Sequence, residues 1–363
     1  MLFVKKRVLE SIMIKVAALT SGKNVPSARF RVRQHISSLN SYNVDVKEFI
    51  PAINKNKGLS YCPKNIILRN LMLLPFQVSK IITRLPGVLG SWKSDVTWLQ
   101  RELLPKYLTL EPLLKSPLVF DVDDAIWLNS DEQARLVKSI ARRSSVILAG
   151  NSYLANWLSQ YNSNIHIIPT AVDVQKFPVI DKLHFTQAQY FQIGWIGTSS
   201  NLKYLEAIEK SLAVFMKKYN NVKLLVMADK PPKLHHLSSD NVEFIKWSRD
   251  SEKKFFKLIH VGLMPLQDTQ WAKGKCSFKM LQYMAAGLPV IASPVGMNKD
   301  VLQKNIIGFE AEITDDWNEY IEALYLDPEL AFSYGVNGRN VVELNYSVDI
   351  VSSMIAGVFK SLA

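Results

Sequence analysis

Short apolar runs and helical periodicities alternate along the whole chain. Polar or glycine-containing turns bound the apolar runs, which is typical of strands buried in a parallel sheet. The runs lie at residues 12–19, 44–49, 95–100, 118–120, 146–149, 165–168, 191–196, 222–227, 242–246, 261–265 and 290–292. Between them, apolar residues recur every three or four positions, which predicts helices that include residues 204–219, 314–326, 329–344 and 348–361. Strands that alternate with helices predict an α/β protein with parallel sheets.

The chain divides into two halves of this kind. The pattern becomes irregular between residues 173 and 190, so we place a domain boundary there. A chain of 363 residues is long enough for two domains of ordinary size. We therefore expect one domain over residues 1–180 and a second over residues 181–345, followed by a last helix within residues 346–363.

Residues 273–293 carry the strongest candidate chemistry, and they predict a loop, a helix, a tight turn and a buried strand. Ser277 is expected to cap this helix. Lys275, Lys279 and Gln282 then share one of its faces, because their spacing matches the helical repeat. A helix start carries free N–H groups and a partial positive charge, so two lysines beside it predict a site for a phosphate or diphosphate. The alternative is a solvated lysine face on an ordinary amphipathic helix.

A second candidate phosphate site follows the apolar run at residues 191–196. Gly197, Thr198 and Ser199 lie between this strand and the next helix, where backbone N–H groups can surround a phosphate. An ordinary turn explains the same residues equally well.

A cluster of arginines in the first half lies after the first predicted strand, where doubly wound sheets bind ligands. Ser27 is expected to cap a helix that carries Arg29 and Arg31. These residues are candidates for binding an acceptor or its phosphate. The alternative is a basic helix that faces solvent.

Three acids, Asp121, Asp123 and Asp124, follow the apolar run at residues 118–120. Acids at the carboxyl end of a strand lie over the cleft and can act in catalysis. The pattern also resembles the first motif of haloacid-dehalogenase-type phosphatases, in which Asp121 would be the nucleophile, Asp123 the acid, and magnesium would be bound. Its position in the middle of the chain, and Ala125 in place of the usual threonine, weigh against that reading. A structural role, capping the next helix or pairing with the arginines of the first helix, is a third interpretation.

The net charge of +12 calls for a polyanionic partner or surface. Nucleic acid, anionic lipid and a phosphate-bearing substrate are the candidates. We expect no nucleic-acid binding, because the basic residues are spread along the chain and form no recognisable nucleic-acid module. Residues 65–92 are apolar and aromatic, contain Arg69, Lys80 and Arg84, and lack any acid. This segment either lies in a membrane interface or forms a core helix interrupted at Pro75.

The remaining composition indicates a globular protein of a reducing compartment, with 48% hydrophobic and 21% charged residues. Cys62 and Cys276 lie far apart and have no His or Cys at ligand spacing, which argues against a zinc site or a disulfide framework. Glu10 and Lys15 interrupt any signal-peptide core, and we find no apolar stretch that predicts a transmembrane span. We expect a cytoplasmic protein.

Residues 283–293, Tyr-Met-Ala-Ala-Gly-Leu-Pro-Val-Ile-Ala-Ser, resemble the donor-binding segment of the retaining glycosyltransferases of family four. The resemblance recurs weakly along most of the chain. The Ser-x-Arg-x-Arg cluster at Ser27 and the Asp-x-Asp-Asp cluster at Asp121 resemble those of a subset of that family. The resemblance implies the GT-B fold, in which two Rossmann-like doubly wound domains face a cleft and the final helix packs back on the first domain.

The same resemblance implies a reaction. A sugar would pass, with retention of configuration, from a UDP- or GDP-linked donor to a hydroxyl of a glycan or a lipid-linked acceptor. The nucleotide sugar is a substrate, and neither a cofactor nor a metal is expected. The resemblance, together with the basic charge and residues 65–92, suggests a peripheral enzyme on the inner face of the membrane. Such an enzyme would build a surface polysaccharide or a lipid-linked glycan.

Residue roles follow from the resemblance in the same way. Phe244 and Ile245 would meet the nucleotide base, and Asp123, ahead of its two neighbours, is our candidate for the acid beside the sugar. Gly274 and Gln282 stand where many family members carry glutamates.

Other interpretations remain open at this stage. They are a phosphatase that uses Asp121 and Asp123, a nucleotide-sugar epimerase, and a transferase-like subunit that has lost catalysis, which Gly274 and Gln282 would explain. The Asp-x-Asp pair could also be mistaken for the metal-binding motif of the other main glycosyltransferase fold.

Overall fold

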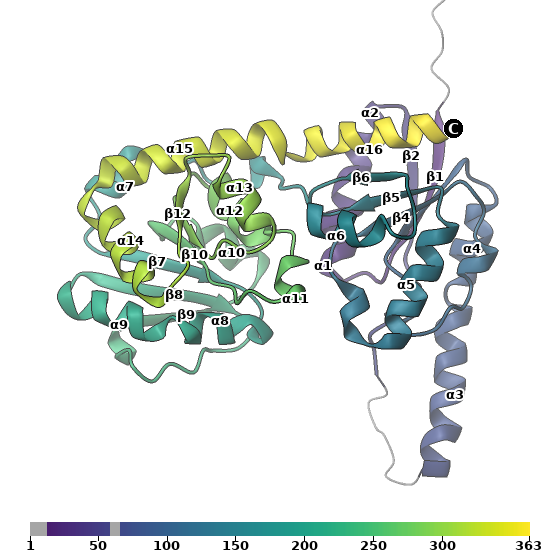
Figure 1. Cartoon of the computed structure of the whole chain (residues 1–363), viewed down its shortest axis with the longest axis horizontal. Helices are drawn as coiled ribbons and strands as arrows, with labels where there is room; N and C mark the ends of the chain where they lie inside the picture. The colour runs from purple at the N-terminus through teal and green to yellow at the C-terminus, as the bar shows by residue number, and fades with distance from the viewer. Residues whose placement is uncertain (1–12, 59–65) are drawn as a thin grey trace, which may run out of the picture.

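Two six-stranded parallel sheets form the two halves of the molecule in the computed structural model, which describes residues 13–58 and 66–363 (Figure 1). The first sheet has the order β2-β1-β3-β4-β5-β6, and the second has the order β12-β11-β10-β7-β8-β9. The neighbouring strands of both sheets run parallel, from β1 with β2 to β11 with β12. Both orders are doubly wound, and their direction reverses between β1 and β3 and between β7 and β10.

The strands lie close to the predicted runs. They are β1 (Ile14–Leu19), β2 (Val44–Phe49), β3 (Val96–Gln100), β4 (Leu118–Val122), β5 (Val146–Ala149), β6 (Ile165–Ile167), β7 (Phe191–Ile196), β8 (Val222–Ala228), β9 (Val242–Lys246), β10 (Val261–Met264), β11 (Val290–Ala292) and β12 (Gly308–Glu310). Two differences matter for the site. Strand β4 continues through Asp121, and β12 is a short strand that the apolar pattern did not predict.

The helices cover the two sheets. Those of the first half are α1 (Pro26–Arg31), α2 (Ile36–Ser41), α3 (Ile66–Ile82), α4 (Leu85–Ser91), α5 (Asp131–Arg143) and α6 (Ser152–Leu158). Those that follow are α7 (Lys182–Thr186), α8 (Leu202–Ala207), α9 (Glu209–Lys218), α10 (Arg249–Phe255), α11 (Gln270–Lys273), α12 (Phe278–Ala285), α13 (Met297–Leu302), α14 (Thr314–Leu326), α15 (Pro328–Asn345) and α16 (Val348–Leu362). The single helix expected over residues 204–219 is therefore two helices, α8 and α9, with a break at Ile208.

Ser27 does not cap its helix, and Ser277 takes the cap position without a side-chain hydrogen bond to the helix. Helix α1 begins at Pro26, one residue before Ser27, because proline is favoured in the first helical position where its missing N–H costs nothing. Ser277 does precede α12, but its backbone is left-handed, with φ of 48°, and its side chain does not bond the helix. The Ser277 hydroxyl instead donates to Asn298 Oδ1 over 2.6 Å.

The chain crosses between the halves a second time near its end, where α16 packs against the first sheet (Figure 1). The Phe359 ring meets the Trp98 ring at a centroid distance of 5.2 Å, and both side chains are fully buried. His35 Nδ1 and the Ser352 hydroxyl lie 2.8 Å apart. Helix α16 thus belongs to the core of the first half.

Helix α3 projects from the first half (Figure 1). Several apolar side chains of α3, of α4 and of the residue after α4 are exposed, with Leu74 at 69%, Ile82 at 55%, Leu89 at 65% and Trp92 at 63%. Hence α3, which contains Pro75, is not an interior helix. Cys62 and the start of the 65–92 segment lie outside the described residues. Within residues 13–58 and 66–363, each helix is too short or too polar to cross a membrane.

Candidate active site

The two halves touch where the loops after their strands meet. Gly274 ends α11 and lies against Ala125, so closely that a Cβ atom at residue 274 would fall 2.5 Å from the Ala125 Cβ. The Asn151 side-chain amide donates to the carbonyl oxygens of Lys273 (3.2 Å) and Lys275 (2.9 Å). These contacts hold the loop before α12 against the acids that follow β4. A glutamate at residue 274 would not fit here without moving the two halves apart.

Lys279 lies in the first turn of α12, beside the end of β7. Its Nζ lies 4.3 Å from the centre of the Trp195 ring at the end of β7. A Cβ at Gly197 would fall 2.5 Å from this Nζ, so the ammonium group occupies the space that the glycine leaves open. Burial, with repulsion from Lys275, lowers the pKa of Lys279 to about 7.

Neither Lys275 nor Lys279 has an acidic partner in the part of the chain that the structure describes. No salt bridge or hydrogen bond joins either ammonium group to a described residue. Lys275 lies beside Trp271, and its charge acts on Asp124. Two half-buried cations without a carboxylate form a site that favours an anion.

The loop that begins at Gly197 is already hydrogen-bonded within the protein. The Ser199 N–H and hydroxyl both donate to Asp229, over 2.5 Å and 2.8 Å, and these bonds lower the pKa of that carboxyl. The Gly197 N–H donates to the Met227 carbonyl, and Thr198 Oγ1 bonds the Ser200 hydroxyl. The Ser199 N–H and hydroxyl are therefore already bonded to Asp229, and the role of this loop at a phosphate stays a prediction.

The three acids have different surroundings. Asp121 is fully buried and accepts hydrogen bonds from Arg31 Nε (2.9 Å) and Trp98 Nε1 (3.2 Å). Burial raises the pKa of Asp121, and the ion pair offsets this only in part. Burial also lowers the pKa of Arg31, but the carboxylates of Asp121 and Asp123 outweigh it and raise that pKa. This pair matches the structural interpretation of the motif, and it commits Arg31 to the protein interior.

Asp123 and Asp124 lie closer to the surface, around Arg101. Arg101 Nε lies 2.6 Å from Asp123 Oδ1, and its Nη2 lies 3.6 Å from Asp124 Oδ2. Arg101 has a left-handed backbone, with φ of 58°, which is uncommon for a non-glycine residue and is often found at functional sites. Burial raises the pKa of Asp123, but Arg101 outweighs it and lowers that pKa. Burial raises the pKa of Asp124, and its side chain is the more exposed of the two, at 23% against 11%.

A cavity of about 470 Å³ between the halves brings together other predicted residues. Arg29 lines it from the first half and Gln282 from α12, where Phe278, which was not predicted as a site residue, lines it too. The Gln282 amide donates to Glu252 Oε1 over 3.0 Å. Sequence reasoning missed the rest of this lining, which includes Arg249 and Phe256.

Phe244 and Ile245 do not reach that cavity. They belong to β9, at the edge of the second sheet, and Phe244 is 36% exposed. Their role at a nucleotide base stays a prediction. Among residues 13–58 and 66–363, no three His, Cys, Asp or Glu side chains lie close enough together to hold a metal ion.

The buried ion pair gives a test of this description. Replacing Arg31 with methionine should lower the free energy of unfolding by about 3–5 kcal/mol, because the Asp121 carboxylate is left buried without a counter-charge. Urea denaturation measures the loss, and the double variant Arg31→Met with Asp121→Leu should recover most of it. Arg29→Met, on the same helix, is the control. A loss under about 1 kcal/mol for Arg31→Met would contradict the pair's structural role.

Comparisons with known proteins agree with this arrangement. The family model of glycosyl transferases group 1 matches residues 191–327, which is less than half of the chain. A search of curated proteins finds no match.

Solved structures of similar fold cover nearly the whole chain. Sucrose-phosphate synthase from Thermosynechococcus elongatus is 13% identical with a TM-score of 0.68, covering 96% of this chain and 98% of that chain. HepE from Anabaena, in complex with UDP-glucose, is 13% identical with a TM-score of 0.67, covering 96% and 100%. WaaG, a glycosyltransferase involved in lipopolysaccharide biosynthesis, is 12% identical with a TM-score of 0.62, covering 95% and 99%. The chain has the GT-B fold, and its second half matches the glycosyl transferases group 1 family.

Proposed function

We propose that the protein transfers a sugar from a nucleoside diphosphate sugar to a hydroxyl of an acceptor, with retention of configuration. The observation that carries this proposal is the pair of cations at the start of α12, Lys275 and Lys279, which lack an acidic partner among the described residues. The family match over residues 191–327 supports it, because that region contains both lysines. HepE, which has a similar fold, was solved with UDP-glucose, and MnaA from S. aureus was solved with UDP.

The lysines would stabilise the departing diphosphate. As the bond from the sugar to the diphosphate breaks, negative charge grows on the leaving oxygen. Lys279 is held close to the ring of Trp195, where a low dielectric strengthens its attraction for that charge. We propose that these charges and the N–H groups of the α12 start act without a metal ion.

The acids on the first half would stabilise the positive charge that develops on the sugar. We propose Asp123 for this role, with Asp124 beside it, because both are partly exposed next to the loop that contains Lys275. Asp121 is fully buried, so it cannot approach a substrate in this conformation. The same burial argues against the phosphatase interpretation, in which the Asp121 carboxylate must attack phosphorus.

The acceptor would enter from the first half. The exposed apolar side chains of α3 and α4, together with the net charge of +12, support a peripheral position on an anionic membrane surface. We propose a glycan or lipid-linked acceptor at the inner face of the membrane, in the synthesis of a surface polysaccharide or a lipid-linked glycan. The donor carries UDP or GDP.

Nucleotide binding tests the carrying observation. UDP or GDP should raise the melting temperature without added metal, because a ligand that binds only the folded state stabilises it by mass action. Lys279→Gln should weaken this binding at least tenfold, since the diphosphate loses a half-buried cation, whereas Lys217→Gln, an exposed lysine on α9, should leave it unchanged. The absence of a shift with both nucleotides and with their sugars would refute the transferase proposal.

Turnover separates an enzyme from a transferase-like subunit. With the correct donor and acceptor, Asp123→Asn should lower kcat by at least about a hundredfold with little change in nucleotide affinity, because the acid acts on the sugar and not on the base. Asp124→Asn is the neighbouring comparison, and NMR of the product reports the anomeric configuration. Nucleotide binding without any turnover would favour a non-catalytic subunit, and an inverted product would contradict retention.

A further inference from the structure

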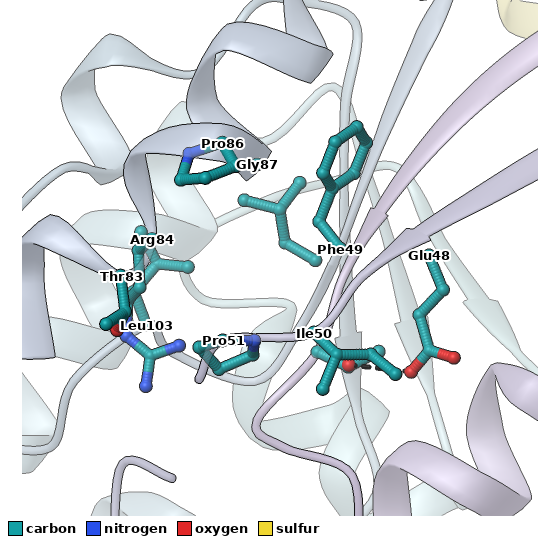
Figure 2. Close-up of a pocket in the computed structure, with 11 residues that line it drawn as sticks. Glu48, Phe49, Ile50, Pro51, Thr83, Arg84, Pro86, Gly87 and Leu103 are labelled. Atoms are coloured by element: carbon teal, nitrogen blue, oxygen red, sulfur yellow. Dashed lines mark hydrogen bonds between the residues drawn. The ribbon is translucent and has the colours of Figure 1, made fainter. Parts of the chain in front are cut away.

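A second cavity, of about 230 Å³, lies in the first half at the carboxyl ends of β1 and β2 (Figure 2). Its lining includes Thr20, Ile50, Pro51, Arg84 and Leu103, and none of its lining residues belongs to the cavity at α12. The carboxyl end of β1 adjoins the point where the strand order of the first sheet reverses, which is where such sheets bind ligands. The volume is below the roughly 300–1,000 Å³ of sites for larger ligands, so it suits a small chemical group.

Arg84 is the unusual residue of this cavity. It lies between α3 and α4 and is only 4% exposed. Its Nε and Nη2 atoms are buried without a hydrogen-bond partner among the described residues, and it forms no salt bridge with them. Burial lowers the pKa of Arg84 to about 10, which leaves it charged at neutral pH. A buried charge without a partner is costly, so an anionic ligand would stabilise it.

The carboxylates nearest to this cavity already have other partners. Glu48 lies across the cavity from Arg84 in Figure 2, and it is bonded by Arg33 through two nitrogens and by the Thr20 hydroxyl. Glu102 pairs with Lys55 at 2.8 Å.

Glu111 and Glu102 are the two carboxylates whose charges raise the pKa of Arg84 against the effect of burial. Glu111 accepts hydrogen bonds from the Leu103 N–H and from Thr109, and it lies beyond salt-bridge distance of Arg84. Lys80, another cation that Arg84 repels, donates to the Lys55 carbonyl. Arg84 therefore lines the cavity with a guanidinium group that has no hydrogen-bond partner among the described residues.

We propose that Arg84 binds an anionic group of the acceptor, a phosphate or carboxylate, in this cavity. This inference rests on the proposed transferase function and adds the chemical class of its acceptor. A guanidinium fork matches the oxygens of such a group in two parallel hydrogen bonds. Ile82 and Leu85 flank Arg84 in the chain and are 55% and 40% exposed, so an apolar tail attached to the anion would lie along α3 and α4.

Binding of simple phosphates to the full chain tests this inference. The probes are decyl phosphate, glycerol 1-phosphate and uncharged decanol, each added to protein saturated with UDP and followed by melting temperature and by phosphorus NMR line width. We expect decyl phosphate to bind and decanol to have no effect at the same concentration. If glycerol 1-phosphate binds as tightly as decyl phosphate, the acceptor is a water-soluble phosphate. If it binds far more weakly, the acceptor is lipid-linked.

The variants Arg84→Gln and Arg84→Lys identify the site. Arg84→Gln should weaken decyl phosphate binding at least tenfold while it keeps the UDP-dependent shift, which shows that the protein is folded. Arg84→Lys keeps the charge but loses the two parallel hydrogen bonds, so its affinity for decyl phosphate should lie between those of the wild type and Arg84→Gln. It replaces the glutamine variant if that variant does not fold. Arg135→Gln, whose side chain is 72% exposed on α5, is the matched control and should bind as the wild type does.

The outcomes separate the two proposals. Equal binding of decyl phosphate by the wild type and both Arg84 variants would overturn the inference, and so would absence of binding in a wild type that responds to UDP. Binding of decyl phosphate that depends on Arg84, without any response to nucleotides, would support the anion site and refute the proposal that the donor is a nucleotide sugar.

Discussion

The second half of the protein holds a lysine ammonium group in a half-buried position without a carboxylate beside it among the described residues. Helix α12 carries Lys279 to within 4.3 Å of the Trp195 ring centre, and Gly197 leaves the space that its Nζ occupies. The aromatic face offers partial compensation, but it does not replace the lost hydration of a cation. A diphosphate would supply the missing charge. The lowered pKa of Lys279 reflects the same imbalance.

The contact between the halves brings the acids after β4 toward the loop before α12. Gly274 packs on Ala125, one residue after Asp124, so the loop that contains Lys275 and the acids of the first half come together. Groups suited to a negative leaving group then lie on one half, and groups suited to a positive sugar lie on the other. The close packing leaves no room at residue 274 for the glutamate that is common at this place in the family that the sequence resembles.

Much of the fold could be predicted from the sequence, because helices cover both faces of a parallel sheet and its strands are therefore continuous apolar runs. The strands at β2, β5, β7, β9 and β11 begin and end where the apolar pattern does. The local chemistry was harder to predict. Ser27 and Ser277 have the right residue type for caps, but Pro26 and a left-handed backbone decided those helix starts.

The site was predictable in part, for a related physical reason. Lys279 could be found because it lies in the first turn of a helix that the apolar pattern predicts. The predicted shared face was wrong, because Lys275 precedes α12 and Gln282 lines the larger cavity together with Phe278. The pairing of Arg31 with Asp121 joins residues that are 90 positions apart, and it remained one of several interpretations. The burial of Arg84 and the contact of Ser199 with Asp229 depend on tertiary packing, of which a single sequence carries no local signal.

The most direct test of the central claim is the pH dependence of UDP affinity in the wild type and in Lys279→Gln. The pKa of Lys279 is about 7 in the free protein, and a bound diphosphate would raise it, so binding takes up a proton above that pH. The wild-type dissociation constant should therefore rise between about pH 7 and pH 9, by at most about tenfold per pH unit, while the variant stays flat. Equal slopes for the two proteins would contradict the claim that Lys279 holds the diphosphate.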